Sequence, residues 1–490
     1  MADALSDTWN WLLSVPHLGL YLAIGWVAYM LGLGGWILLQ KRPPVATLSW
    51  LLGLAALPYL GFVVYLVFGP QRIKRHRLRR ARSRVSLPEP EAWADAGGAA
   101  ELATLATATT GIARDSAISV RLLVDGGDTY ESLLEAIAGA RHHVHLEYYI
   151  FAADRSGTLL RDALVERARA GVAVRLLMDA VGSAKCPRTF FAPLLEAGGE
   201  IAWFHPMRFG RIWQRTWINL RSHRKIVVVD GRIGFMGSQN LIDRSYDSPK
   251  NIKRGLKWQE LMARLTGPVV AEVNTVFLSD WLIETGEDLS ATEHLPATEV
   301  SQSTAPDALM CQVVPSGPVY DTENNLRLFL SLIYGATEKV ILTSPYFVPD
   351  EAMVYAITSA CQRGVEVQLF VSEIGDQFMV WHAQRSYYSA LLEAGVRIFL
   401  YPAPYILHSK HFSIDDDIAV IGSSNMDIRS FSLNSEVSLM VRGETFVSAM
   451  REIEQGYRDA GRELTLEEWR REPKKATFLD GVMRLTSALN

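Results

Sequence analysis

Residues 223–240 of the chain are His223-Arg-Lys-Ile-Val-Val-Val-Asp230-Gly-Arg-Ile-Gly-Phe-Met-Gly237-Ser-Gln-Asn240. Residues 408–425 repeat the pattern as His408-Ser-Lys-His-Phe-Ser-Ile-Asp415-Asp-Asp-Ile-Ala-Val-Ile-Gly422-Ser-Ser-Asn425. Each copy has a histidine, a lysine two residues later, an aspartate further on, and Gly-Ser-x-Asn at its end. Two copies of one pattern at identical spacing predict two related halves that share one site with two-fold symmetry.

Each copy predicts two strands joined by a turn. Apolar and β-branched residues precede the aspartate, and a second apolar run leads into Gly-Ser. The residues between the two runs, Asp-Gly in one copy and Asp-Asp-Asp in the other, favour a turn. Since residues two apart in a strand share a face, we expect His223 and Lys225 to point the same way, as do His408 and Lys410.

The residue types in the repeat indicate chemistry on a phosphodiester. This group is negatively charged and repels nucleophiles, so its site needs cations, hydroxyls and amides around the non-bridging oxygens. The two lysines can supply the charge, and the predicted phosphate-binding groups are Ser238, Asn240, Ser423 and Asn425. No cluster of His, Cys, Asp and Glu has metal-ligand spacing, and we expect neither a metal nor another cofactor.

The repeated motif resembles that of the phospholipase D superfamily. The resemblance implies that one histidine attacks phosphorus while the other protonates the leaving alkoxide and later deprotonates the incoming alcohol. It favours His223 as the nucleophile and His408 as the acid and base, although spacing alone cannot order two such similar halves. The catalytic set then consists of His223, Lys225, Asp230, His408, Lys410 and Asp415, of which the two aspartates, in this superfamily, chiefly hold the turn.

The resemblance also implies a carboxylate that orients each catalytic imidazole. An acidic residue follows each Gly-Ser-x-Asn in the superfamily, and Glu260 and Glu436 occupy these places. Such a carboxylate fixes the tautomer and stabilises the protonated ring. The alternative is that Glu436 is a solvated strand residue and that Glu260 pairs with Arg264, four residues later.

The duplication extends beyond the motif and predicts the fold class. Leu194-Leu-Glu-Ala-Gly198 recurs as Leu391-Leu-Glu-Ala-Gly395, and residues 168–179 parallel residues 361–372. In each half, strands alternate with stretches of helical period, which is typical of α/β units around a mostly parallel sheet. We expect two phospholipase D-like α/β/α lobes, residues 111–295 and 296–490, forming a pseudo-two-fold pair with the active site between them.

The amino terminus predicts a membrane anchor. Residues 18–39 and 47–69 are two apolar runs, each close to the ~20 residues that span hydrocarbon, so residues 1–70 are expected to form two transmembrane helices. A basic segment follows, with Arg72, Lys74, Arg75, Arg77, Arg79, Arg80, Arg82 and Arg84. By the positive-inside rule, both termini and the catalytic part lie in the cytoplasm of a multi-pass protein of the bacterial inner membrane.

The basic segment belongs to the predicted juxtamembrane region and linker, residues 71–110, and suits anionic lipid headgroups. A nucleic-acid-binding tail is the competing hypothesis. Of the 49 basic residues, eight lie in this segment, which leaves 41 against 53 acidic residues. A surface that follows a polyanion is normally basic, so we expect a lipid bilayer and no nucleic acid as partner.

Within the superfamily, the chain resembles the bacterial cardiolipin synthases. The segments that carry this resemblance include Trp258-Gln-Glu-Leu-Met-Ala-Arg-Leu-Thr-Gly-Pro268, Ser344-Pro-Tyr-Phe-Val-Pro349 and Asn425-Met-Asp-Ile-Arg-Ser430. The resemblance implies that phosphatidylglycerol is both donor and acceptor, giving cardiolipin and glycerol through a phosphatidyl-histidine. A membrane-bound phospholipase D or headgroup-exchange transphosphatidylase would use the same residues, whereas a silent scaffold would have lost some. The sequence leaves the oligomeric state open.

Overall fold

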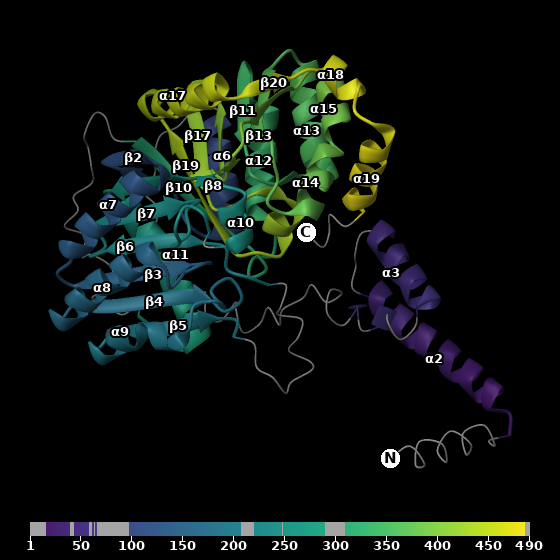
Figure 1. Cartoon of the computed structure of the whole chain (residues 1–490), viewed down its shortest axis with the longest axis horizontal. Coiled ribbons are helices and arrows are strands. Elements are labelled where there is room, and N and C mark those ends of the chain that lie inside the picture. Colours follow the sequence, from purple (N-terminus) through teal and green to yellow (C-terminus); the bar gives the residue numbers. More distant parts are fainter. Residues whose placement is uncertain are drawn as a thin grey trace. The chain divides into compact units, whose positions relative to one another are not determined.

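A computed structural model describes residues 16–39, 44–57, 61–62, 64–65, 98–206, 220–246, 248–289 and 309–485 (Figure 1). The apolar helices near the amino terminus form one compact unit, and the described residues from 98 onward form another. The basic segment of residues 72–84 lies outside the described residues.

The amino-terminal unit contains helices α2 (Leu18–Leu38) and α3 (Pro44–Ala56). Over the described ranges, α2 is the one helix long and apolar enough to cross a membrane. Helix α3 has 13 residues, which is short of the ~20 that a span requires. Ile37, Leu54 and Tyr65 pack together in this unit. The predicted second span over residues 47–69 continues beyond α3 into residues that are only partly described, and it stays a prediction.

The first lobe is an α/β layer built on a seven-stranded sheet with the order β2-β9-β7-β6-β3-β4-β5. Helices α7, α8 and α9 contact this sheet and contribute to one hydrophobic cluster. Helix α11 also contacts the sheet, and several of its buried residues belong to a second cluster. The elements are β2 (Ser119–Val124), α7 (Asp125–Ala138), β3 (His143–Tyr148), α8 (Arg155–Arg169), β4 (Ala173–Asp179), α9 (Ala192–Glu196), β5 (Glu200–Phe204), β6 (Lys225–Val229), β7 (Ile233–Gly237), α10 (Pro249–Lys253), β8 (Lys257–Gln259), β9 (Leu261–Thr266) and α11 (Val269–Thr285).

The second lobe repeats this sheet strand for strand, with one extra strand at each edge: β1-β10-β19-β17-β16-β11-β13-β14-β20. The strands are β1 (Asp115–Ala117), β10 (Leu309–Ser316), β11 (Lys339–Thr343), β13 (Glu366–Ser372), β14 (Arg397–Tyr401), β15 (Tyr405–Leu407), β16 (His411–Ile414), β17 (Ile418–Gly422), β19 (Glu436–Arg442) and β20 (Arg462–Leu464). The helices include α12 (Asn324–Gly335), α13 (Glu351–Gln362), α14 (Phe378–Arg385), α15 (Tyr388–Ala394), α16 (Ile428–Ser432), α17 (Glu444–Ala460), α18 (Leu466–Arg470) and α19 (Lys474–Arg484). The equal strand order confirms the predicted pair of α/β lobes.

The expectation of mostly parallel sheets is wrong. In the first lobe only β3, β4 and β5 run parallel, and every pairing among β3, β6, β7, β9 and β2 is antiparallel. The second lobe has the same mixture. The physical reason is the motif itself, because a hairpin of two strands joined by a tight turn can only be antiparallel.

The end of the predicted linker, residues 71–110, is helical in the structure. Residues 98–110 form helix α6 (Gly98–Thr110), in which Ala106 is buried in the core of the second lobe. Strand β1 then pairs antiparallel with β10 at the edge of the second sheet. The chain therefore passes along the second lobe before it enters the first, whose sheet begins with β2 at Ser119 rather than at residue 111.

The two lobes share an apolar core. Ile226 and Val228 of β6 and Met236 of β7 lie in one cluster with Ala419 and Ile421 of β17. The alternate residues of β6, Val227 and Val229, face the helices of their own lobe. Because both faces of the motif strands are buried, the hairpins are fixed between two cores, and the residues at their ends are held in place.

Candidate active site

Each motif histidine lies on a segment that pairs with the other lobe. Ser222 forms a parallel bridge with Ser435, and the amide of His223 donates to the Ser435 carbonyl at 2.8 Å. In the other copy, β15 pairs parallel with β8, and the amide of His408 donates to the Gln259 carbonyl at 2.8 Å. The backbone thus places each histidine beside the residue that precedes the glutamate of the opposite lobe.

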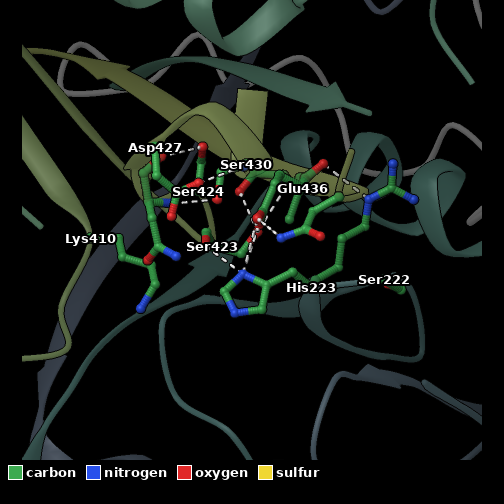
Figure 2. Close-up of polar contacts among 12 residues, drawn as sticks. Ser222, His223, Lys410, Ser423, Ser424, Asp427, Ser430 and Glu436 are labelled. Carbon is green, nitrogen blue, oxygen red and sulfur yellow. Dashed lines mark hydrogen bonds and ion pairs between the residues drawn. The ribbon is translucent and has the colours of Figure 1, made fainter. Parts of the chain in front are cut away.

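The imidazole of His223 consequently meets Glu436 and not the glutamate of its own half (Figure 2). Nδ1 lies 3.0 Å from Oε1 and 3.1 Å from Oε2 of that carboxylate, and 3.0 Å from the carbonyl oxygen of Ser423. Acceptors on this side assign the proton to Nδ1. The Nε2 lone pair is then available to an electrophile.

The second pair is built in the same way. Nδ1 of His408 lies 2.8 Å from Oε1 and 2.9 Å from Oε2 of Glu260. The hydroxyl of Tyr246 donates to Oε1 of Glu260 at 2.7 Å, and the amide nitrogen of Asn240 donates to this hydroxyl at 3.0 Å. In the other half, the amide of Asn434 lies 3.4 Å from Glu436. Glu436 is buried and is therefore not a solvated strand residue. Glu260 is buried as well, and its ion pair is with His408 rather than with Arg264.

The serines of the motif contact these carboxylates. Ser238 Oγ donates to Glu260 Oε2 at 2.6 Å, and Ser423 Oγ donates to Glu436 Oε2 at 2.5 Å. Both serine side chains are fully buried. A hydroxyl can donate one hydrogen bond, and each of these serines donates it to the glutamate and not to a phosphate. The phosphate contact expected for the two serines stays a prediction, and the structure gives them a contact that the sequence analysis did not anticipate.

The two lysines are buried beside the histidines. Lys410 Nζ donates to the His408 carbonyl at 2.6 Å, and Lys225 Nζ donates to the His223 carbonyl. Burial lowers the pKa of Lys225 to about 7 and that of Lys410 to about 8, against the opposing attraction of Glu436 and Glu260. Because burial removes water from each ammonium group, a neighbouring anion such as a phosphodiester stabilises its protonated form.

The histidines themselves are held neutral. Burial lowers the pKa of His223 and of His408 to about 4, and the neighbouring lysines act in the same direction. Burial opposes ionisation of the glutamates as well, but the hydrogen bonds from the imidazole and the serine, together with the charge of the lysines, outweigh it and lower the pKa of both. The resting site therefore contains neutral imidazoles and anionic carboxylates. A neutral imidazole with a protonated Nδ1 is competent to attack phosphorus.

The motif aspartates lie at the far end of their strands. Asp230 accepts the amides of residues 141–143 at 2.8–2.9 Å, and Asp415 accepts those of residues 337–339. Both have positive φ, 53° and 46°, in the turn of the hairpin. These amide contacts lower the pKa of both carboxyls despite their burial. The aspartates thus tie the hairpin turn to the start of β3 or β11, as expected of a structural role.

A cavity of about 460 Å³ connects the two histidines. His223, His408, Asn240 and Asn425 line it, whereas Ser238 and Ser423 do not. Its wall also contains residues outside the repeated positions, namely Tyr149, Arg221, Tyr246, Tyr346, Asp376, Gln377, Asp427, Arg429 and Asn434. Of these, Tyr346, Asp427 and Arg429 lie in segments that carry the resemblance to the cardiolipin synthases. The others could not be found by comparing the halves, since Tyr246 matches Phe431 and Arg221 matches Ile406.

Arg221 and Arg224 flank the first histidine and fix its segment. Arg221 is buried and pairs with Asp179, whose oxygen lies 3.4 Å away, at the end of β4. Arg224 is buried as well, pairs with Asp280 of α11 and donates Nε to the Glu436 carbonyl at 3.0 Å. The second contact crosses between lobes, so Arg224 reinforces the position of Glu436 against His223. Within the described ranges, no three His, Cys, Asp or Glu side chains are grouped to hold a metal ion.

Sequence comparison assigns the chain to a family. A profile described as "Cardiolipin synthase, PLD-like domain" matches residues 133–281 and 329–455, which include both histidines. The chain is 36% identical to the cardiolipin synthase of Halalkalibacterium halodurans, over 82% of this chain and 80% of that one. The chain belongs to the cardiolipin synthase family.

Further comparisons agree with this membership. Cardiolipin synthase 1 of Bacillus anthracis is 31% identical over 98% of this chain and 96% of its own length. A profile described as "Phospholipase_D-nuclease N-terminal" matches residues 22–70, the apolar region. The crystal structure of phosphatidylserine synthase from Haemophilus influenzae Rd KW20 covers 80% of this chain and 100% of that one, with a TM-score of 0.60 and 14% identity. It confirms the fold of this cardiolipin synthase family member.

Proposed function

We propose that this chain transfers a phosphatidyl group from one phosphatidylglycerol to the headgroup hydroxyl of a second, forming cardiolipin and releasing glycerol. Family membership supports a phosphatidyltransferase of the phospholipase D type that makes cardiolipin. The observation that carries the mechanism is the pair of neutral histidines on one cavity, each held by a glutamate of the opposite lobe. Phosphatidylglycerol as donor and acceptor is the specific part of the proposal.

In the first step, Nε2 of His223 attacks the phosphorus of the donor lipid. A bond forms between Nε2 and phosphorus, and the bond from phosphorus to the glycerol oxygen breaks. His408 gives its proton to that oxygen, because an unprotonated alkoxide leaves poorly. The donor phosphate and Glu260 are both negative and favour a protonated His408 once the lipid is bound. Asn240 and Asn425 line the cavity and can contact the non-bridging oxygens, and Lys225 and Lys410, buried beside the histidines, supply positive charge.

In the second step, His408 takes the proton from the headgroup hydroxyl of a second phosphatidylglycerol. The hydroxyl oxygen bonds to phosphorus, and the bond to His223 breaks, which returns the enzyme to its starting state. Glu436 stabilises His223 as its charge changes, and Glu260 does the same for His408. Synthesis instead of hydrolysis requires that the lipid alcohol outcompete water while the intermediate exists.

The membrane supplies both substrates. The apolar helix α2 and the matched amino-terminal profile indicate a membrane-associated protein. We further propose that residues 1–70 cross the bacterial cytoplasmic membrane twice and that the catalytic lobes face the cytoplasm. The net positive segment that follows residue 71 supports this orientation.

Product analysis tests the proposed function. Purified protein in detergent is incubated with phosphatidylglycerol that carries a label in its acyl chains, and the lipids are separated. Cardiolipin, with one glycerol released for each cardiolipin, is the expected result. Phosphatidic acid as the sole product would identify a phospholipase D, and exchange with added alcohols without cardiolipin would identify a headgroup-exchange enzyme.

A further inference from the structure

The two ends of the cavity differ in chemistry although the halves are homologous. At the His223 end the wall contains two arginines, Arg221 and Arg429. At the His408 end it contains Tyr346, Asp376 and Gln377. The ring of Tyr346 lies edge-on to that of His408, with centroids 6.2 Å apart. The cavity wall contains two carboxylates, and a carboxylate repels phosphate. That of Asp427 accepts the Ser430 amide at the start of α16, whereas that of Asp376 lies with Tyr346 near His408.

Asp376 is built into the wall by specific contacts. The hydroxyl of Tyr346 donates to Oδ2 of Asp376 at 2.9 Å, and the amide of Gln377 donates to this hydroxyl at 3.0 Å. Arg254, which follows α10 of the first lobe, donates to the Gly375 carbonyl at 3.1 Å and fixes the loop from the other side. Burial raises the pKa of the Asp376 carboxyl. The loop is thus held by both lobes with a partly desolvated carboxylate on the cavity.

A polyol is the ligand that this wall fits. Two neighbouring hydroxyls can donate to a carboxylate, and the Gln377 amide and Tyr346 hydroxyl supply further donors and acceptors. The alcohol that leaves, or enters, must have one oxygen at His408, since this histidine handles its proton. When the terminal hydroxyl of a glycerol headgroup is at His408, its remaining hydroxyl is free for the neighbouring wall, in which Tyr346 lies against His408 and hydrogen-bonds to Asp376 and Gln377. Arginines, by contrast, suit the phosphate at the other end.

We propose that Asp376, with Tyr346 and Gln377, forms the subsite that recognises the hydroxyls of the glycerol headgroup. The inference rests on the proposed function and deepens it by assigning the preference for a glycerol-bearing lipid to a residue outside the repeated motif. In the transfer step, the glycerol oxygen bonds to phosphorus, its proton passes to His408, and the bond from phosphorus to His223 breaks. Asp376 does not exchange a proton with the substrate and acts on specificity.

Alcohol exchange tests this subsite with the intact protein. Phosphatidylglycerol is the donor, and labelled glycerol or 1-propanol is the added acceptor; the two alcohols share a three-carbon chain. The wild-type protein should favour glycerol, and Asp376→Asn should lower kcat/KM for glycerol about tenfold to hundredfold, the range expected for losing hydrogen bonds to a charged group. Transfer to 1-propanol should persist, which shows that the variant folds and that His223 and His408 still work. Because the glycerol that leaves the donor occupies the same subsite, the decisive readout is the ratio of glycerol transfer to 1-propanol transfer, which should fall in Asp376→Asn.

The matched control is Glu373→Gln, three residues earlier in the chain. Glu373 pairs with Arg462 at 2.9 Å, and it does not line the cavity between the histidines. Its glycerol-to-propanol ratio should equal that of the wild type. An equal loss with both alcohols in Asp376→Asn, or an unchanged ratio, would overturn the subsite while leaving the proposed function intact. No exchange with either alcohol and no cardiolipin in the wild type would instead overturn the proposed function, and the subsite with it.

Discussion

Nδ1 of His223 lies 3.0 Å from Oε1 of Glu436, a residue 213 positions later in the chain and on the other lobe. The reciprocal pair, His408 and Glu260, has the same geometry at 2.8 Å. Each half therefore supplies the histidine of one pair and the carboxylate of the other. Neither half contains a complete histidine–glutamate pair, and the two lobes share an apolar core and form one compact unit.

Converting either glutamate to glutamine should slow catalysis strongly. Glu436→Gln and Glu260→Gln preserve size but remove the charge that fixes the tautomer and stabilises the imidazolium. We expect turnover to fall by about 10²–10⁴-fold, as for other triad-type orienting groups, with the fold retained. Turnover is measured as cardiolipin formed, and the fold by thermal unfolding in detergent.

Glu272→Gln is the control for these two variants. Glu272 is also a buried carboxyl, on α11, and burial raises its pKa to about 7, so neutral glutamine is tolerated there. It lies outside the cavity and should leave turnover near normal. Near-normal turnover in both Glu436→Gln and Glu260→Gln would show that the observed hydrogen bonds do not contribute to catalysis.

The pH dependence of kcat/KM should have two limbs set by the free enzyme. The pKa of His223 is lowered to about 4, so the neutral imidazole that attacks is lost only as the pH falls through about 4. His408 must be protonated to act as the acid, and its pKa is also lowered to about 4 in the free enzyme, so kcat/KM should decline as the pH rises above that value. The lysine pKa values are lowered to about 7 and 8, so the cations that hold the phosphate are lost as the pH rises through this range. Initial rates at low substrate concentration across pH 4–10 measure both limbs. Full activity maintained to pH 10 would contradict the low lysine pKa values.

The motif aspartates should affect stability more than chemistry. Asp230→Ala removes a carboxylate that accepts three backbone amides, and we expect it to lower the free energy of unfolding by about 1–3 kcal/mol. The pKa of Asp230 is lowered in the fold, so its contribution is present above the unfolded pKa and is lost as the pH falls through the folded pKa. Thermal unfolding at pH 7 and at pH 3 should show a smaller difference from wild type at pH 3. A normal melting temperature with abolished turnover would assign Asp230 to the chemistry instead.

The basic segment that precedes the lobes should bind anionic membranes. A protein that lacks residues 1–70 keeps Arg72, Lys74 and the six arginines that follow. We expect it to bind vesicles containing phosphatidylglycerol weakly and to be released by high salt, because charge attraction at a surface is screened. Vesicle sedimentation measures this binding, and neutral vesicles are the control. Equal binding to neutral and anionic vesicles would show that the segment does not act through charge.

The sequence predicted the lobes well because the motif constrains them strongly. Two identical patterns of apolar strands and turns define the hairpins of residues 225–237 and 410–422, and they also imply the pseudo-symmetry. The pairing of His223 with Glu436 was not predictable in the same way. It depends on short parallel pairings between lobes, such as Ser222 with Ser435, and these leave no periodic signal in the sequence.

Two further features escaped prediction for related reasons. The serines of Gly-Ser-x-Asn directly follow a buried strand. The sequence does not show that their hydroxyls donate to Glu260 and Glu436, because this contact depends on how the strands pack. Asp376 has no place in the repeat, because it belongs to a loop after β13 that differs from the loop after β4. Residues that distinguish the two ends of a pseudo-symmetric cavity are invisible to a comparison of its halves.

The proposed mechanism requires a covalent phosphatidyl group on one of the two histidines, and trapping that adduct tests it most directly. Purified protein is mixed with labelled phosphatidylglycerol and quenched at alkaline pH within the first turnover, because a phosphorus–nitrogen bond to histidine is labile in acid. Peptides are then mapped by mass spectrometry. A phosphatidyl group on His223, absent from His223→Ala, is the predicted result, and His408→Ala should form it much more slowly because it lacks the acid for the first step. Cardiolipin formation with no adduct on either histidine, or an adduct on His408 alone, would contradict the account.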